Sequence, residues 1–373
     1  MVGVAPELPT AVDRSIDAAV HRHVEDILAR YLAERRAELP ELARTFAHAV
    51  DTLTDFALGG GKRLRPTFAW WAWRAAGGEP DGPRARAVLH AVSALELIQA
   101  CALVHDDIMD ASELRRGRPT VHVRFTEAHR AGGWAGEPER FGTAAAILLG
   151  DLALAWADDM FSGAELEPDM RAAARGPWQA MRAEMFAGQY LDVLAQAEGD
   201  ESEERALGVA RLKTAAYTVE RPLHMGVAFA GAGPATVEAV RRFGTDIGVA
   251  FQLRDDLLGM FGDTEVTGKP AGDDLREGKR TLLMALGLDY ATRAGRHADA
   301  DLMRRALGNP DLVPETLTRV REALVDLGAV EELERRIESL TSSAMAALDR
   351  AGLADPGVTR LRDLAVAATR RDR

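Results

Sequence analysis

The sequence predicts an all-α protein, and three observations support this fold class. Ala, Leu, Glu and Arg, which are strong helix formers, dominate the 373 residues. Apolar residues recur at spacings of three and four, as on one face of a helix, and no run of alternating Val, Ile, Thr and Tyr of the kind that forms strands appears. Breaks rich in glycine and proline separate helical patterns of about 15 to 30 residues. These breaks lie at 59–61, 77–83, 132–138, 198–204 and 262–278.

No shift in composition and no repeat of fixed period divides the chain, so we expect one helical domain over residues 16–373 after a flexible tail at 1–15. The 46 Lys and Arg against 58 Asp and Glu give a net charge of −12, which argues against a nucleic-acid partner. The first residues lack the pattern of a secretory signal. The most apolar stretch, Thr143 to Ala157, is about 15 residues long and contains Asp151, too short and too polar for a bilayer. We therefore expect a cytoplasmic protein with no membrane span.

The helical pattern over 97–110 is apolar and ends in aspartates. On a helix, Asp106 and Asp110 lie one turn apart on the same face, with about 6 Å between their Cβ atoms, so they can share a hard cation. A solvated acidic helix end is the simpler alternative, but acids are unfavourable at the negative end of a helix dipole. Gln99, seven residues before Asp106, lies on roughly the same face and is placed near the same site.

A second apolar helical pattern, over 248–259, reaches another pair of aspartates, Asp255 and Asp256. If the two helix ends face each other, they form a strongly negative cleft that repels anions until divalent metal ions fill it. The paired motifs therefore predict a site for Mg²⁺ and phosphate.

Two clusters supply positive charge. The glycine turn at 59–61 is followed by Lys62, Arg63 and Arg65, and its open backbone amides suit a diphosphate. Arg115 and Arg116 follow the first acidic motif, and guanidinium groups bind phosphate oxygens in a bidentate way. The spacing is not that of the P-loop, so a nucleotide site is disfavoured. Ordinary surface charge is the alternative for each cluster, but their occurrence together with the acidic pairs favours a diphosphate site.

The order and spacing of five motifs make the chain resemble the trans-isoprenyl diphosphate synthases, the polyprenyl synthetase family, and most of all its geranylgeranyl diphosphate synthases. The resemblance extends from about Asp51 to Thr281 and rests on GGGKRLRP at 59–66, HDDIMDASELRRGRPTVH at 105–122, GQYLDV at 188–193, KTAAYT at 213–218 and FQLRDDLLGMFGDTEVTGKPAGDDLREGKRT at 251–281. It implies the type I isoprenoid synthase fold, a single large antiparallel bundle of helices around a deep central cavity, with the aspartate motifs facing each other at its mouth. It also implies a homodimer.

The resemblance further implies a Mg²⁺-dependent prenyltransferase that joins isopentenyl diphosphate to an allylic diphosphate, head to tail and in trans. Three Mg²⁺ ions, for which Mn²⁺ can substitute, would hold the allylic diphosphate. Ionisation of the allylic carbon–oxygen bond leaves a highly charged diphosphate, which metal ions, Lys and Arg stabilise. The double bond of isopentenyl diphosphate then attacks the allylic cation, and a proton leaves.

The resemblance implies the role of each residue at a matching motif position. The metal ligands are Asp106, Asp110 and Asp255, and the residues that support them are Asp107 and Asp256. The residues that bind the allylic diphosphate are Arg115, Lys213, Lys269 and Lys279. The residues that bind isopentenyl diphosphate are Lys62, Arg65, Gln99 and Arg116. The residues that line the reacting centre are Thr214, Tyr217 and Gln252. For Tyr217, a packed aromatic ring is the alternative.

Gly259 departs from the family pattern, because many relatives have a third aspartate at this position of the second motif. Asp255 and Asp256 remain, and Asp273 and Asp274 follow in the next loop. We therefore expect catalysis to survive, with Asp274 as the compensating group.

Product length should depend on the residues four and five positions before Asp106, where the family places its stopper. Here these are Ala102 and Cys101, which are both small. Ile98 and Leu95, deeper on the same side of the helix, are candidates for a later floor, although core packing would also place them there. The small residues favour a C20 product, geranylgeranyl diphosphate, and farnesyl or longer polyprenyl diphosphates are the alternatives.

Two other functions remain open. A terpene cyclase would share the first motif, but its second motif should carry Asn, Ser and Glu, which DDLLGMFGD lacks. A non-catalytic regulatory subunit of a prenyl synthase should lose an aspartate motif, and only Gly259 points that way.

Overall fold

The computed structural model describes residues 15–262 and 272–370. Most of the expected N-terminal tail, residues 1–14, lies outside the described residues, and so does Lys269. The predicted all-α fold is confirmed. Within the described ranges the only sheet is a two-stranded antiparallel hairpin of β1 (Leu114–Arg115) and β2 (Arg118–Pro119).

The four longest helices all begin at a proline. At the first position of a helix the missing N–H costs no hydrogen bond, and the fixed φ of proline already suits the helix. Pro83 and Pro138 stand at the ends of two predicted breaks, whereas Pro168 and Pro234 start helices where no break was predicted. The four helices are α4 (Pro83–Met109), α6 (Pro138–Gly163), α7 (Pro168–Glu198) and α10 (Pro234–Phe261).

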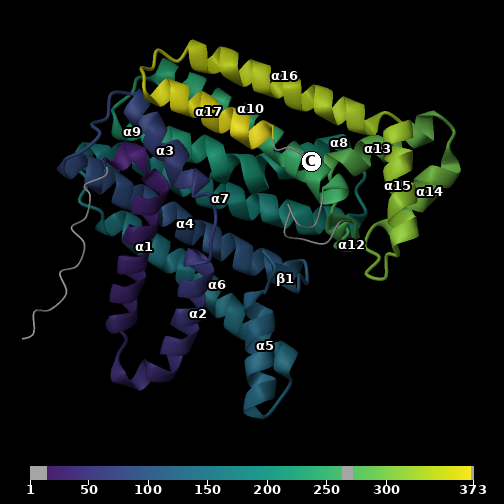
Figure 1. The fold of residues 1–373 in the computed structure, drawn as a ribbon, viewed down its shortest axis with the longest axis horizontal. Helices are drawn as coiled ribbons and strands as arrows, with labels where there is room; N and C mark the ends of the chain where they lie inside the picture. Colours follow the sequence, from purple (N-terminus) through teal and green to yellow (C-terminus); the bar gives the residue numbers. More distant parts are fainter. Residues whose placement is uncertain (1–14, 263–271, 371–373) are drawn as a thin grey trace, which may run out of the picture.

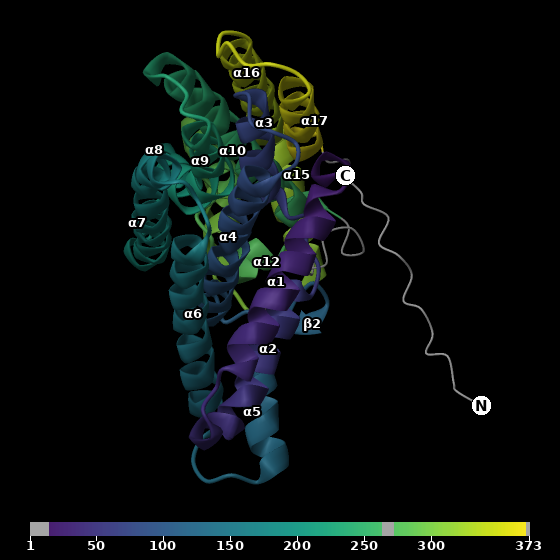
Figure 2. The same ribbon diagram turned by 90° about the vertical axis from the view of Figure 1, so that its left-hand side faces the viewer.

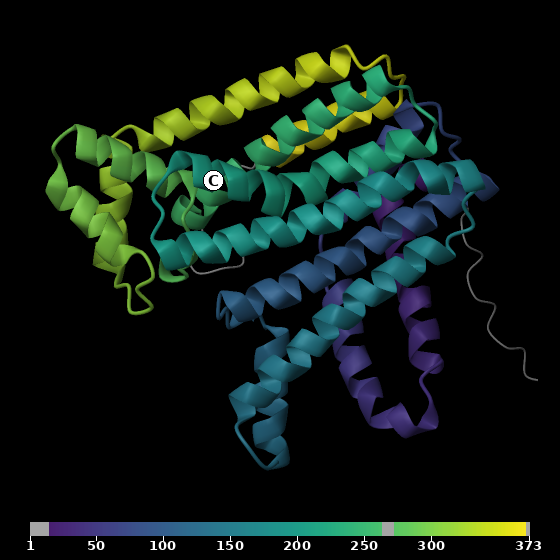
Figure 3. The same cartoon turned by 180° about the vertical axis from the view of Figure 1, so that it is seen from behind.

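These long helices lie side by side and form the body of the molecule (Figure 1). Helix α4 packs against α6, and the two cross the molecule below α7 in the view of Figure 3. A helix in three parts packs against both α7 and α10. Its parts are α8 (Glu203–Val209), the π-helical segment η3 (Ala210–Glu220) and α9 (Arg221–Phe229).

The N-terminal helices cover one side of this body. Helices α1 and α2 form a hairpin against α4, α3 packs on α9, and α5 packs on α6 (Figure 2). These elements are η1 (Ile16–Ala18), α1 (Val20–Ala37), η2 (Glu41–Phe46), α2 (Ala47–Leu58), α3 (Leu64–Ala75) and α5 (Val121–Gly132).

The C-terminal helices complete the fold. Helices α13, α14 and α15 gather at one end of the molecule, while α16 and α17 pack along α10 (Figure 1). Their bounds are α12 (Asp273–Arg276), α13 (Leu282–Arg293), α14 (His297–Ala306), α15 (Pro314–Asp326), α16 (Ala329–Asp349) and α17 (Gly357–Thr369).

Two apolar cores hold these helices together. The larger core includes Trp70 and Trp178, which are both nearly inaccessible to solvent, and it joins the N-terminal helices to α4, α6, α7 and α10. The smaller core joins α10 to the C-terminal helices. Because both cores include side chains of α10, this helix connects the two halves of the chain and fixes the position of the second aspartate motif.

Two helices, α4 and α6, are long and apolar enough to cross a membrane. The sequence pattern, with its shorter apolar run from Thr143 to Ala157, predicted no such helix. In α4, 78% of the most apolar window is buried inside the protein, and in α6 the share is 39%. The core helices of soluble proteins have the same length and composition, so these two helices are only weak support for a membrane span. The absence of a span therefore stays a prediction.

Two glycines allow α7 and α10 to approach the π-helical segment closely. A Cβ atom on Gly188 of α7 would lie 2.1 Å from the backbone nitrogen of Lys213. A Cβ atom on Gly248 of α10 would lie 2.6 Å from Cα of Ala215. Contacts this short are sterically impossible, so only glycine permits this packing. The two helices thereby fix the backbone that carries Lys213 and Thr214.

Candidate active site

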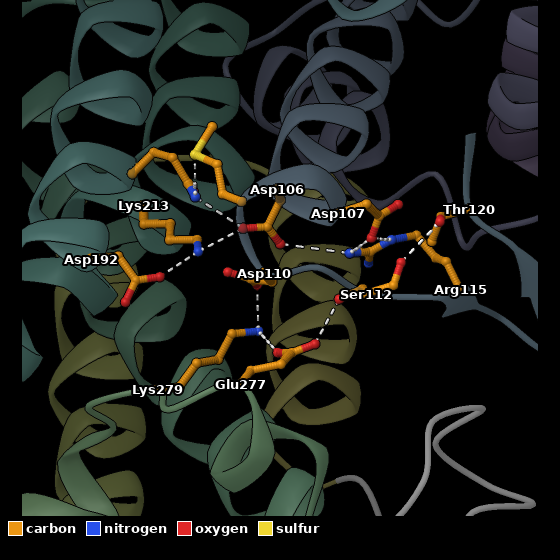
Figure 4. A network of polar contacts seen from close by, with 12 residues as sticks. Asp106, Asp107, Asp110, Ser112, Arg115, Thr120, Asp192, Lys213, Glu277 and Lys279 are labelled. Atoms are coloured by element: carbon orange, nitrogen blue, oxygen red, sulfur yellow. Dashed lines mark hydrogen bonds and ion pairs between the residues drawn. The ribbon is translucent and has the colours of Figure 1, made fainter. Parts of the chain in front are cut away.

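Asp106 lies near the C-terminal end of α4, among positive side chains (Figure 4). Lys213 Nζ lies 2.8 Å from Asp106 Oδ1, and Gln189 Nε2 donates a hydrogen bond to the same oxygen at 3.1 Å. Burial alone would raise the pKa of Asp106. The positive charges of Lys213, Lys279 and Arg115 outweigh burial and hold that pKa well below its usual range. Asp106 is therefore ionised at neutral pH although it is largely buried.

Lys213 links three elements of the fold. From η3 it reaches Asp106 on α4, and its Nζ also lies 2.5 Å from Asp192 Oδ2 on α7. Burial would lower the pKa of Lys213, but the two carboxylates raise it above its ordinary value. The ammonium group therefore keeps its proton.

Asp110, one turn after Asp106, is paired with Lys279, whose Nζ lies 3.0 Å from Asp110 Oδ2. The same ammonium group lies 2.6 Å from Glu277 Oε2, and Ser112 Oγ donates a hydrogen bond of 2.6 Å to Glu277 Oε1. These contacts attach the segment after α12 to the first aspartate motif (Figure 4). Burial and the charge of Asp106 raise the pKa of Asp110 to about 6, even though Lys279 lowers it.

Asp107, between these two aspartates in sequence, faces away from them. Its side chain is fully buried and accepts a hydrogen bond of 2.7 Å from Arg115 Nε. The terminal Nη2 of Arg115 lies 3.6 Å from Asp106 Oδ2. Asp107 therefore orients an arginine toward the site, which suits the supporting role expected of it.

The second motif presents Asp255 and Asp256 near the C-terminal end of α10. Asp256 Oδ1 accepts a hydrogen bond of 2.7 Å from Gln252 Nε2, one turn earlier. Burial is the main cause that raises the pKa of Asp256 to about 8, and the charges of Asp274 and Asp255 add to it. The ionised form of Asp256 is therefore unfavourable here, and an added positive charge would favour it.

A cleft of about 440 Å³ lies beside the first motif. Gln99 and Arg116 line it, together with the glycine turn, as expected for a second diphosphate site. Arg116 Nη1 donates a hydrogen bond of 2.6 Å to the carbonyl oxygen of Gly60, which joins the β-hairpin to that turn. Five arginines lie in the lining and outnumber its three acidic residues, Asp55, Glu96 and Glu127, so the cleft is suited to an anion. The arginines are at 63, 115, 116, 118 and 124.

Arg65 and Lys62 do not line this cleft. Arg65 is buried, donates a hydrogen bond of 2.9 Å to Thr218 Oγ1 and stacks its guanidinium 4.2 Å from the ring centre of Tyr217. Lys62 is exposed on the turn between α2 and α3. Tyr217 thus contacts Arg65, which is expected to bind isopentenyl diphosphate, and packs in the larger core. Its place at the reacting centre stays a prediction.

The structure brings together most of the predicted residues, from α4, η3, α10 and the segment after α12. Lys269 lies outside the described residues. Sequence reasoning missed Gln189, Asp192, Ser112 and Glu277, which bond to the charged groups of the site. A signal was available for Gln189 and Asp192, since they stand three residues apart in the motif GQYLDV and so share a helix face.

The residues of the first motif fit a divalent metal. Asp110 Oδ2 is buried and, apart from its ion pair with Lys279, accepts no well-aligned hydrogen bond from the described residues. Burial is the main cause that raises the pKa values of Asp110 and Asp256, so their ionised forms are unfavourable without more positive charge nearby. A divalent cation would relieve both. No three His, Cys, Asp or Glu side chains in the described ranges are close enough to hold a metal by themselves. The remaining ligands of a bound Mg²⁺ would be oxygen atoms of water and of the substrate.

Comparison with known proteins decides the family. Residues 47–320 match the family model of the polyprenyl synthetases. The chain belongs to the polyprenyl synthetase family. The resemblance inferred from the motifs is therefore confirmed, and this polyprenyl synthetase is a trans-prenyltransferase that makes prenyl diphosphates.

Several relatives of known type resemble this polyprenyl synthetase along most of its length. A geranylfarnesyl diphosphate synthase from Aeropyrum pernix is 35% identical over 306 residues, which are 79% of this chain and 85% of the relative. A (2E,6E)-farnesyl diphosphate synthase from Mycobacterium tuberculosis is 34% identical over 305 residues, 82% of this chain and 78% of the relative.

The crystal structure of a geranylgeranyl pyrophosphate synthase from Corynebacterium glutamicum, complexed with isoprenyl diphosphate and magnesium, has the same fold. It superimposes with a TM-score of 0.90 at 44% identity and covers 94% of this chain and 98% of its own. The type I isoprenoid synthase fold implied by the motifs is therefore confirmed.

Proposed function

We propose that this polyprenyl synthetase is a Mg²⁺-dependent geranylgeranyl diphosphate synthase, which condenses isopentenyl diphosphate with allylic diphosphates up to the C20 product. The observation that carries the proposal is the pairing of Asp106 with Lys213 and of Asp110 with Lys279. These two pairs bring together, at one site, carboxylates that can hold a metal ion and ammonium groups that can bind a diphosphate. The magnesium in the Corynebacterium relative supports the choice of metal.

Asp106, Asp110 and Asp255 are the side chains that would hold Mg²⁺, which when bound supplies positive charge for the departure of the allylic diphosphate. With Asp106 and Asp110 engaged in this way, Lys213 and Lys279 would each lose one carboxylate partner and would stay oriented by the other, Asp192 for Lys213 and Glu277 for Lys279. Their ammonium groups are then available to the diphosphate oxygens, together with Arg115, which Asp107 orients. Positive charge is thus already in place where negative charge develops on the departing diphosphate.

Isopentenyl diphosphate would bind in the basic cleft beside Gln99 and Arg116, and Lys62, which is exposed on the neighbouring glycine turn, would reach it from outside the lining. Arg65, which is buried behind the cleft lining, would act indirectly: its guanidinium would hold the ring of Tyr217 beside the reacting carbons. Thr214 and Gln252 would turn their oxygen atoms toward the allylic cation, while the surrounding helices exclude water. The double bond attacks the cation, and the proton that leaves is taken up by the departed diphosphate.

The product length would be set on α4. Ala102, one turn before Asp106, is half-buried, whereas Cys101 is fully buried and its Sγ lies 3.8 Å from His105 Nδ1. His105 Nε2 in turn lies 3.2 Å from the carbonyl oxygen of Ile147 on α6, so Cys101 packs on the side of α4 that faces α6. Ala102 is therefore the better candidate for the floor. Ile98 lies one turn deeper and is fully buried. A small residue at 102 leaves room for a chain longer than farnesyl.

A homodimer would cover an apolar face of α6 and α7, two helices that flank α4 (Figure 3). Both helices carry large apolar side chains that are exposed to solvent, and such side chains mark a protein–protein interface when they form a patch. They are Ile147, Leu148, Phe186, Tyr190 and Val193.

The decisive experiment supplies the purified protein with Mg²⁺, labelled isopentenyl diphosphate and, in turn, the C5, C10 and C15 allylic diphosphates. The dephosphorylated products are then sized by chromatography. We expect a dominant C20 alcohol and no elongation after removal of Mg²⁺ with EDTA. As a matched control, Asp106→Asn removes the first metal ligand at almost constant volume and should abolish elongation.

Other results would favour the alternatives. A C15 or a longer alcohol would keep the chemistry and change only the product. A complete lack of elongation with Mg²⁺ present, while the protein still binds allylic diphosphate, would favour a non-catalytic regulatory subunit.

A further inference from the structure

Arg63 follows the glycine turn at 59–61 and stands immediately before α3. Its backbone has a φ of 49° and a ψ of 41°, in the left-handed region that a residue with a side chain rarely adopts. The side chain is only 3% exposed. Because an unpaired buried charge is costly, this guanidinium depends on specific partners.

The partners of Arg63 come from three helices. Its Nη1 donates hydrogen bonds of 2.8 Å to Glu96 Oε2 on α4 and of 2.8 Å to the carbonyl oxygen of Ala57 on α2. Its Nε donates a longer one, of 3.3 Å, to Glu25 Oε1 on α1. The Glu96 side chain is 2% exposed, so both members of this ion pair are buried. Arg63 thus attaches the end of the glycine turn to the helices behind it.

The same ion pair forms part of the wall of the basic cleft. Arg63 and Glu96 both line the cleft, and Glu96 stands one turn before Gln99 on α4. Arg63 Nη2 and Glu96 Oε1 are buried and have no hydrogen-bond partner among the described residues. The pair therefore lies against the cleft and is not enclosed in the apolar core.

Glu96 places a buried negative charge in a cleft that is suited to an anion. Such a charge by itself repels a diphosphate. Glu96 also acts on Arg116: burial and the charges of Arg115 and Arg63 lower the pKa of Arg116, whereas the charge of Glu96 raises it. A carboxylate at this position is explained if its bond to Arg63 contributes more to binding than its repulsion removes.

We propose that Arg63 is a positioning residue, which through its ion pair with Glu96 holds the glycine turn at the cleft where isopentenyl diphosphate binds. The inference rests on the proposed function. The turn precedes Lys62 and carries open backbone amides, and Arg116 holds its other side through the carbonyl oxygen of Gly60. Arg63 acts through the turn and needs no contact with the substrate. The turn is thus in position before the substrate arrives, which lowers the cost of binding.

The first test is Glu96→Gln, which keeps the volume and leaves Arg63 with a neutral, weaker acceptor. With the C10 allylic diphosphate at saturation, the KM for isopentenyl diphosphate should rise about tenfold, because the turn loses its anchor. The KM for the C10 allylic diphosphate should change by less than about twofold. Charge alone predicts the opposite sign, since loss of a negative charge from an anion site tightens binding.

The matched control for charge is Glu127→Gln. Glu127 lies on α5, is exposed and lines the same cleft. The variant removes the same charge from the lining without loosening the turn. Its KM for isopentenyl diphosphate should therefore not rise.

The double variant Arg63→Met/Glu96→Met separates positioning from stability. Apolar side chains of similar size replace the buried ion pair, so the thermal unfolding midpoint should stay near that of the wild type. The turn is no longer attached to α4, so the KM for isopentenyl diphosphate should still rise about tenfold.

A KM for isopentenyl diphosphate that falls or stays constant in Glu96→Gln would overturn the inference, and so would a double variant with a wild-type KM. An equal rise in the KM values of both substrates would indicate a general disturbance of the fold and would also overturn it. If Glu96→Gln does not fold, the double variant decides by the same criteria. In each case elongation by the wild type upholds the proposed function. A wild type that elongates no allylic diphosphate overturns the proposed function, and the inference with it.

Discussion

Gly188 illustrates how single atoms fix the position of Lys213. The side chain of Lys213 is held by Asp106 and Asp192, and its backbone nitrogen would lie 2.1 Å from a Cβ atom at position 188. The position of Lys213 therefore depends on the lack of a side chain at Gly188 as well as on the charged partners of Lys213. A change at Gly188 should act on the reaction through the backbone of Lys213.

We expect Gly188→Ala to lower the free energy of unfolding by about 1–3 kcal/mol, because the new methyl group forces α7 and η3 apart. The shift of Lys213 should also reduce kcat at saturating Mg²⁺. Chemical denaturation and steady-state kinetics measure the two effects. Gly208→Ala is the control, since nothing lies within 4 Å of a Cβ atom there and the variant should retain its stability. Equal behaviour of the two variants would contradict the prediction.

His224 should make the stability depend on pH. Burial and the charges of Arg221 and Arg241 lower its pKa to about 4, from an ordinary value of 6.5. Between pH 6.5 and 4 the unfolded imidazole binds a proton that the folded one does not, so the free energy of unfolding falls as the pH decreases. Allowing for the partial exposure of the ring, this loss is about 1–2 kcal/mol.

The measurement for His224 is urea denaturation at several pH values, for the wild type and for His224→Gln. The difference between the two proteins isolates the imidazole from the carboxylates that titrate in the same range. It should shrink by about 1–2 kcal/mol from pH 7 to pH 4. A difference that stays constant over this range would contradict the pKa shift.

At the scale of elements, α4 sets both the site and the predicted product length. Its regular period places Ala102 and Ile98 below Asp106 on successive turns, and the fold leaves Ala102 half-buried while it closes off Ile98. A chain attached to a diphosphate at Asp106 would therefore meet position 102 first.

We expect Ala102→Phe to shorten the main product to C15, because an aromatic ring fills the space below Asp106. Product sizing after elongation from the C5 and C10 primers measures the effect. Leu103→Phe is the matched control, since Leu103 lines the basic cleft instead and should leave the chain length at C20. If Ala102→Phe still gives C20, the floor lies deeper, at Ile98 or Leu95.

The π-helical segment η3 could not be predicted from the sequence. The apolar period predicted a helix there, and the segment is continuous with α8 and α9 because Val209 and Arg221 both have helical dihedral angles. The change to π-helical hydrogen bonds coincides with the close contacts that Gly188 and Gly248 permit. Local propensity cannot predict such a change, because its causes lie in α7 and α10.

At the scale of the whole molecule, the apolar face of α6 and α7 predicts a homodimer. Leu148 is 63% exposed and Tyr190 is 67% exposed, so an acidic residue at either position would place charge in the interface. We expect Leu148→Glu to convert the dimer to a monomer in sedimentation velocity experiments. Val325→Glu, at a valine of α15 that is 55% exposed, should leave the dimer intact. A wild type that sediments as a monomer would refute the prediction.

The sequence by itself determined the helical class, the breaks between helices and the charged motifs, because helix periodicity, proline, glycine and charge act over a few neighbouring residues. It also carried enough ordered motifs to reveal the family. Only the tertiary structure decided which charges meet: that Lys213 pairs with Asp106 and Asp192, that Asp107 turns to Arg115, and that Asp274 fills the space at Gly259. Lys213 and Asp106 are 107 positions apart, and only the packing of whole helices brings them together. The other two contacts depend on how the chain folds back after α4 and after α10.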